Sequence, residues 1–92
     1  MQKIKVLMID DNVKLVDAVK EYFKDNDEID IVLSAYDGLE GFEVITNKIN
    51  EYDVIVLDLI MPKKDGIYIL EKCVKMVSTR KLSLQLVIML VK

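Results

Sequence analysis

The sequence predicts an α/β fold in which helices cover a parallel sheet, and two observations carry this prediction. Apolar runs suited to strands alternate with segments of helical periodicity in the order βαβαβαβ, and the connections are short. The first and third of these runs are apolar at nearly every position, as expected when helices cover both faces of a sheet. Parallel neighbours joined in this way imply right-handed crossovers.

Composition indicates one small domain spanning residues 1–92 without a linker or repeat. Apolar residues at 52% are sufficient for a core, and charged residues at 32% are typical of a globular chain. The net charge of −3 gives no general attraction to nucleic acid or to an anionic membrane. One cysteine excludes an internal disulfide and favours a reducing cytoplasm. The longest apolar-rich run, Leu82 to Val91, is too short to span a bilayer.

The first half of the sequence contains two strand–helix units. The first strand runs from Lys3 to Ile9, and the helix after it begins behind a cap near Asn12 and ends near Lys24. The second helix spans Gly38 to Asn50. Apolar residues alternate along the second strand, at Ile29, Ile31, Leu33 and Ala35. The predicted apolar stripes of the two helices are Leu15, Val16, Val19, Tyr22 and Phe23, then Leu39, Phe42, Ile45 and Ile49.

The second half continues the pattern. A third strand spans Asp53 to Asp58, and Pro62 and Gly66 punctuate the loop after it. A third helix follows from Ile67 to about Val77, and a polar connection leads to a fourth strand at 84–90. The predicted inward residues of the third helix are Ile67, Leu70, Val74 and Val77, and Cys73 is expected to be a small packing residue.

Acidic residues follow two of the predicted strands. Asp10 and Asp11 come after the first strand, and Asp58 ends the third. Ligands of parallel α/β sheets bind beyond the carboxyl ends of the strands, so we expect these carboxylates to meet at one edge. Because like charges repel and the ligands are all oxygen, the cluster favours Mg²⁺ or Mn²⁺. The absence of histidine excludes imidazole metal sites and Ser-His or Cys-His nucleophile pairs.

This arrangement indicates phosphoryl transfer, in which Asp58 attacks phosphorus and forms an acyl phosphate. A simpler interpretation is that Asp11 or Asn12 only caps a helix. The loop Met61-Pro62-Lys63-Lys64-Asp65-Gly66 has two interpretations as well. In the first, the loop fixes the position of the residues around Asp58, and Gly66 adopts a positive φ. In the second, the loop is an ordinary strand-to-helix turn in which Asp65 caps the helix.

These residues resemble the receiver domains of two-component response regulators, which have the doubly wound, three-layer, flavodoxin-like (CheY-like) fold. The acidic pair, the Val-Leu-Asp58 segment and the Met-Pro-Lys-Lys-Asp-Gly loop match that family's motifs. The resemblance implies that Asp10, Asp11, Asp58 and the backbone carbonyl of Ile60 bind magnesium (Mg²⁺), and that Asp58 accepts phosphate. Within the family, the stretches 3–6, 52–62 and 86–90 most resemble the stage-zero sporulation regulator of spore-forming bacteria.

The sequence departs from the family pattern after its fourth strand. By that resemblance it is an incomplete receiver, without the fifth strand, the last helices or a DNA-binding output domain. Val91 stands where the family has a hydroxyl residue, and Lys92 is not the family's conserved lysine. An apolar edge strand at 84–90 would favour self-association or exchange of elements in a dimer.

Two functions remain open from the sequence. The first is a non-enzymatic receiver that takes phosphate from a histidine kinase or histidine phosphotransferase in a phosphorelay, without the residues that drive a switch. The second is a non-catalytic interaction module that docks a kinase or competes for it. A haloacid-dehalogenase-type phosphatase is disfavoured because Ile60 stands where that family has a second acid. A flavin-binding domain is disfavoured because acid-lined strand ends repel phosphate.

Overall fold

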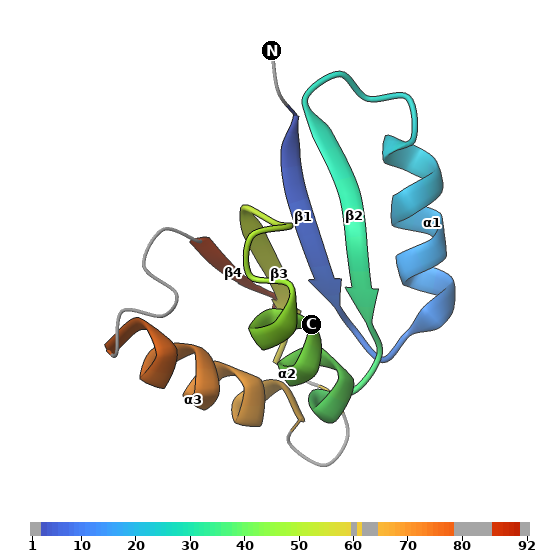
Figure 1. Ribbon diagram of the computed structural model, residues 1–92. Coiled ribbons are helices and arrows are strands. Elements are labelled where there is room, and N and C mark those ends of the chain that lie inside the picture. The colour runs from blue at the N-terminus through green and yellow to red at the C-terminus, as the bar shows by residue number, and fades with distance from the viewer. Residues whose placement is uncertain (1–2, 60, 62–64, 79–85, 91–92) are drawn as a thin grey trace.

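A computed structural model of the chain shows a four-stranded parallel sheet with three helices, and it describes residues 3–59, 61, 65–78 and 86–90. The strand order is β2-β1-β3-β4 (Figure 1). The predicted order of elements and the parallel sheet are confirmed. The strands are β1 (Ile4–Ile9), β2 (Ile29–Ala35), β3 (Val54–Asp58) and β4 (Leu86–Leu90), and the helices are α1 (Val13–Phe23), α2 (Gly38–Asn47) and α3 (Asp65–Ser78).

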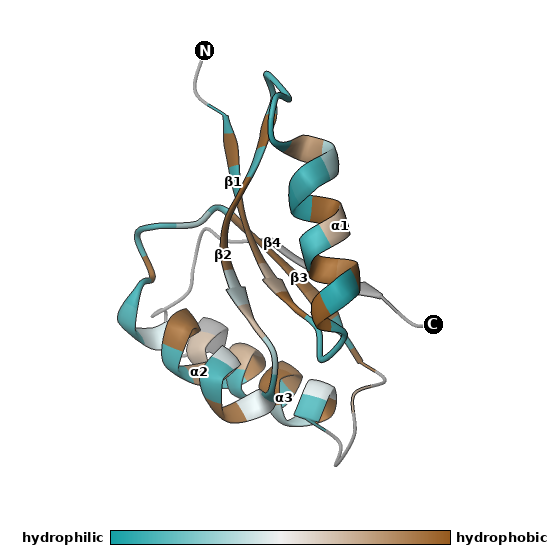
Figure 2. Cartoon of the chain, turned by 90° about the vertical axis from the view of Figure 1, so that its right-hand side faces the viewer, coloured by the Kyte–Doolittle hydropathy of each residue, from teal (hydrophilic) through white to brown (hydrophobic). Residues whose placement is uncertain are grey.

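The elements form three layers. Helix α1 lies on one face of the sheet, and α2 and α3 lie together on the other (Figures 1 and 2). The main core lies between the sheet and the α2/α3 layer, where four strand residues are fully buried. These are Leu7, Ile9, Ile55 and Leu57, and they pack with Ile45 from α2 and with Ile69 and Cys73 from α3.

Strand β2 departs from the predicted simple alternation. Its pairing with β1 runs from Val6↔Ile31 directly to Leu7↔Leu33, so Val32 is an extra residue at a bulge. Paired residues of parallel strands share a face, and successive residues alternate. The apolar residues before the bulge therefore lie on the α1 side with Val6, and those after it lie on the α2/α3 side. The predicted strand is confirmed, and the bulge divides its alternating apolar residues between the two faces of the sheet.

The predicted stripes of α2 and α3 are only partly correct. Leu39 is 67% exposed and Val74 is 57% exposed, whereas Ile45 is fully buried as predicted. In α2 the buried positions also include Gly38 and Gly41. A Cβ at position 41 would lie 2.8 Å from the Cδ1 of Ile69, so α2 approaches α3 more closely than a larger residue permits. At the start of α2 the glycines face inward in place of Leu39, and Ile45 takes the inward position one turn later.

Two further residues that were predicted to face the core are exposed, and the side chain of a third lies outside the described residues. Tyr22 at the end of α1 is 79% exposed, although Val16 of the same helix is fully buried. In α3, Ile67 is 41% exposed because the inward side of the helix is formed by Ile69 and Cys73. The side chain of Val77 lies outside the described residues, as do those of β4.

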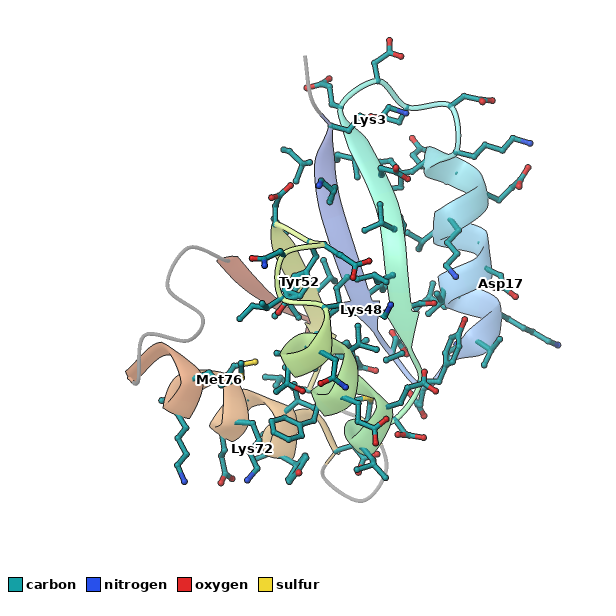
Figure 3. The ribbon with its side chains drawn as sticks, viewed as in Figure 1. Lys3, Asp17, Lys48, Tyr52, Lys72 and Met76 are labelled. Atoms are coloured by element: carbon teal, nitrogen blue, oxygen red, sulfur yellow. The ribbon has the colours of Figure 1, made fainter. Side chains whose placement is uncertain are left out.

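Tyr52 lies beside the start of β3 (Figure 3), and it belongs to the buried core together with Cys73. The Tyr52 hydroxyl donates a hydrogen bond of 2.9 Å to the carbonyl of Ile45 in α2. Burial, with a smaller contribution from Cys73, raises the pKa of Tyr52 to about 12, and burial raises the pKa of Cys73 to about 11. The prediction that Cys73 is a buried packing residue is confirmed. None of the described helices combines the length and apolar character that a membrane span requires.

Candidate metal centre

Three carboxylates meet at the carboxyl edge of the sheet. Strands β1 and β3 are direct neighbours, paired at Ile9↔Leu57, so the residues that follow these two positions emerge side by side. One carboxylate oxygen from each of Asp10, Asp11 and Asp58 lies within 4.8 Å of the others. Asp10 and Asp58 are almost fully buried, with exposed fractions of 1% and 2%, while Asp11 is exposed.

Hydrogen bonds near the start of α1 show which residue caps this helix and which residues belong to the acid cluster. The side chain of Asn12 accepts a bond of 3.1 Å from the backbone N–H of Leu15, which makes Asn12 the N-cap of α1. Asp10 accepts a bond of 2.9 Å from the backbone N–H of Asn12, and this bond orients its carboxylate at the end of β1. The capping interpretation therefore applies to Asn12, and Asp11 lies at the open rim of the cluster.

The donor set fits a hard divalent cation. The residues that meet here offer carboxylate oxygen alone, which suits Mg²⁺ or Mn²⁺ rather than Zn²⁺. Burying two carboxylates beside each other is costly unless positive charge or hydrogen bonds compensate them. An ion at the mouth of this cluster would supply such charge while its remaining positions stay open to water or to a phosphoryl oxygen.

Gly66 is required by close packing and not by its backbone angle. Its φ lies outside the left-handed range, so the expectation of a positive φ is wrong. A Cβ at position 66 would collide with the carbonyl oxygen of Asp58 and lie 2.6 Å from the Cα of Leu59. The first turn of α3 therefore rests directly on the backbone of Asp58.

Asp65 belongs to α3, but its side chain caps the start of α2. It begins α3, and its Oδ2 accepts a hydrogen bond of 2.8 Å from the backbone N–H of Gly38 at the start of α2. Asp65 and Gly66 were predictable from the sequence as residues near the site, but the role of Gly38 and Gly41 was not. Two glycines three residues apart in a predicted helix were the available signal, because that spacing places them on one helix face.

Several predicted site residues lie outside the described part of the chain. These are Ile60 with its backbone carbonyl, Pro62, Lys63, Lys64, Val91 and Lys92. Their roles stay predictions.

The chain matches the family model described as the response regulator receiver domain over residues 6–90. The chain belongs to this family. Among curated proteins, the receiver is 42% identical over 67 residues to a protein-glutamate methylesterase/protein-glutamine glutaminase of Methanococcus maripaludis. That match covers 73% of this chain and 18% of the relative.

Solved structures of receiver domains are similar over nearly the whole chain. The response regulator domain of Thermotoga maritima CheB has a TM-score of 0.75 and 29% identity, covering 98% of this chain and 61% of that one. A response regulator receiver domain protein from Clostridium thermocellum has a TM-score of 0.73 and 30% identity, covering 96% of this chain and 64% of that one. The bacteriophytochrome response regulator AtBRR, 23% identical with a TM-score of 0.67, shares the fold.

These relatives support the receiver family and the three-layer fold. The chain spans less than two thirds of the length of the curated relative and of the first two structures. The predicted placement in the sporulation branch is not shown by them and stays a prediction.

Proposed function

We propose that this receiver accepts a phosphoryl group on Asp58 in a Mg²⁺-assisted transfer from a histidine kinase or histidine phosphotransferase. The observation that carries the proposal is the meeting of Asp10, Asp11 and Asp58 within 4.8 Å, with two of the three buried at the ends of adjacent strands. The setting we propose is a cytoplasmic signalling pathway, and a sporulation phosphorelay is the pathway that the sequence resemblance favours.

The reaction needs little from the protein beyond position and charge. A carboxylate oxygen of Asp58 attacks the phosphorus of a phosphohistidine, forming a P–O bond while the P–N bond breaks. The bonding pair leaves with the imidazole nitrogen, which takes a proton, and Asp58 becomes an acyl phosphate. Bound Mg²⁺ would offset the negative charge that the phosphoryl oxygens bring to this acidic edge. Asp10, Asp11 and Asp58, with the Ile60 carbonyl, are the residues that would hold it.

Intact-mass measurement tests the acceptor. The wild-type chain, incubated with acetyl phosphate and Mg²⁺, should gain one phosphoryl group, and chelation of Mg²⁺ should abolish the gain. Asp58→Asn should gain none, because the nucleophilic oxygen pair is lost. Asp53→Asn is the matched control, since Asp53 precedes the same strand at its other end and accepts a bond from the Lys5 N–H. An equal adduct on Asp58→Asn would reject Asp58 as the acceptor.

The alternative function, a non-catalytic module that docks or competes for a kinase, gives a different result. It predicts kinase binding that is unchanged in Asp58→Asn and no adduct on the wild-type chain. In the described part of the chain β4 forms one edge of the sheet, so association of two copies through residues 84–90 is part of the proposal. Solution mass should then rise with concentration, and a constant monomer mass would contradict the association.

A further inference from the structure

Helices α2 and α3 are joined at their first residues by a contact that only small residues permit. The carboxylate of Asp65 accepts a 2.8 Å hydrogen bond from the N–H of Gly38. Gly38 is the first residue of α2, so this N–H has no acceptor within its own helix. A Cβ at position 38 would lie 3.0 Å from the Cγ of Asp65, so the side chain of Asp65 packs closely against the backbone of Gly38.

The same end of α3 touches the backbone of the proposed phosphoacceptor. Gly66, next to Asp65, packs so closely that a Cβ would meet the carbonyl of Asp58 and lie 2.8 Å from the carbonyl carbon of Leu59. These contacts are with backbone atoms, which cannot rotate away as a side chain can. A shift of the first turn of α3 therefore acts on the strand end that carries Asp58.

Helix α2 touches the other strand end. A Cβ at Gly41 would lie 3.2 Å from the Cγ2 of Ile9, and Ile9 directly precedes Asp10. We call Gly38, Gly41, Asp65 and Gly66 the helix-start clasp. One side of the clasp rests on the end of β1 and the other on the end of β3, and Asp65 is the hydrogen-bonding residue that ties the two sides together.

We infer that Asp65 is a positioning residue for the acid cluster: by tying α2 to α3 it holds the strand ends of Asp10 and Asp58 at the separation that a shared cation needs. The inference rests on the proposed function, because it assigns Asp65 a role in the same site. Ligand groups have to be held within about 0.5 Å of their working geometry, and supporting residues provide this precision. Asp65 acts through backbone packing and is not a metal ligand in this account.

Two substitutions separate positioning from simple helix capping. Asp65→Ala and Asp37→Ala each remove one carboxylate from the start of α2, since Asp37 accepts a 2.8 Å bond from the N–H of Glu40. Both should destabilise the fold by similar amounts. Only Asp65→Ala should weaken Mg²⁺ binding and slow phosphorylation by acetyl phosphate, each by about tenfold, as supporting residues of metal sites do. Asp37→Ala should stay within about twofold of wild type in both measurements.

Calorimetric titration with Mg²⁺ and the rate of the mass gain are the readouts. Asp65→Asn, which keeps an acceptor oxygen, should recover most of the lost affinity. Equal Mg²⁺ affinities for Asp65→Ala and Asp37→Ala, whether both unchanged or both weakened, would overturn the inference while leaving Asp58 as acceptor intact. Failure of the wild-type chain to bind Mg²⁺ would overturn the proposed function itself.

A measurement on the wild-type chain avoids any loss of folding in the variants. Binding and clasp formation are reciprocally coupled, so Mg²⁺ should stabilise the clasp as much as the clasp stabilises Mg²⁺ binding. Saturating Mg²⁺ should therefore slow hydrogen exchange of the Gly38 amide, which is bonded to Asp65, about tenfold. The Glu40 amide, bonded to Asp37, should change by less than about twofold. Equal changes at the two amides would contradict the positioning role.

Discussion

The two faces of strand β3 differ in how completely they are packed. Ile55 and Leu57 point toward α2 and α3 and are fully buried. Val54 and Val56 pair with Val6 and Met8 on the α1 side and are only half-buried. Figure 2 shows α1 as the helix on that side and α2 with α3 on the other.

The closest packing beside the acid cluster comes from the α2/α3 layer. The α2/α3 layer approaches the sheet through Gly41 and Gly66. A methyl group at Gly66 would collide with backbone atoms, and one at Gly41 would press on the side chain of Ile9. Those contacts lie beside Ile9 and Asp58, at the strand ends where the carboxylates meet. The α1 layer contributes the Asn12 cap, and on its side Val6 and Met8 of β1 are buried whereas Val54 and Val56 of β3 are half-buried. We therefore expect the site to be sensitive to changes on the α2/α3 side and tolerant of changes on the α1 side.

The largest loss of stability should come from removing a buried side chain on the face that packs against α2 and α3. Leu57→Ala should lower the free energy of unfolding by about 4 kcal/mol, because a fully buried side chain is lost and a cavity remains. Val54→Ala, three residues earlier in the same strand on the half-buried face, should cost about 1 kcal/mol. Urea denaturation measures both values. Equal losses would mean that the two faces are packed alike.

The next effect tests the contact between α3 and the Asp58 backbone. Gly66→Ala should cost about 3 kcal/mol, because the new methyl group meets backbone atoms that cannot move aside. Gly38→Ala should cost about 1 kcal/mol, since its methyl group meets the side chain of Asp65, which can shift. Only Gly66→Ala should displace the Asp58 amide resonance strongly in a two-dimensional NMR spectrum. A Gly66→Ala protein with wild-type stability would show that this contact is looser than described.

A smaller effect should appear in alkaline solution. The pKa of Cys73 is about 11 in the folded chain against an ordinary value of 9.0, so the folded state favours the neutral thiol. The associated stability is complete below pH 9 and is lost as the pH rises toward 11, a loss on the order of 2 kcal/mol. Tyr52, with its pKa of about 12, extends the decline to higher pH.

Cys73→Ala is the control for this pH dependence. It should lower stability at neutral pH, because the buried sulfur is lost, but flatten the decline between about pH 9 and 11. Chemical denaturation across this pH range is the measurement. An unchanged slope in Cys73→Ala would show that the thiol does not carry the alkaline loss.

Much of the fold was predictable because strand-forming runs and helical periodicity are local signals. The division of β2 between two faces was not, since the bulge at Val32 depends on its pairing with β1. Hydrophobicity predicted the inward position of Ile45 but not those of Gly38 and Gly41. The need for Gly41 arises from Ile69, which lies in another helix.

The candidate site shows the same division. Asp10, Asp11 and Asp58 were predictable as a cluster, because parallel strands bring their carboxyl ends to one edge. The partner of Asp65 was not predictable, since Gly38 is 27 residues away in sequence and the bond joins two helix starts. Local chemistry thus identified the carboxylates, and tertiary packing determined what holds them in place.

Asp58, and neither Asp10 nor Asp11, should carry the phosphoryl group, and chemical trapping can identify the modified residue. Borohydride reduces an acyl phosphate of aspartate to homoserine, which tandem mass spectrometry locates after proteolysis. After incubation with acetyl phosphate and Mg²⁺, we expect homoserine at position 58 alone. Homoserine at position 10 or 11, or at no position in a folded chain that binds Mg²⁺, would contradict it.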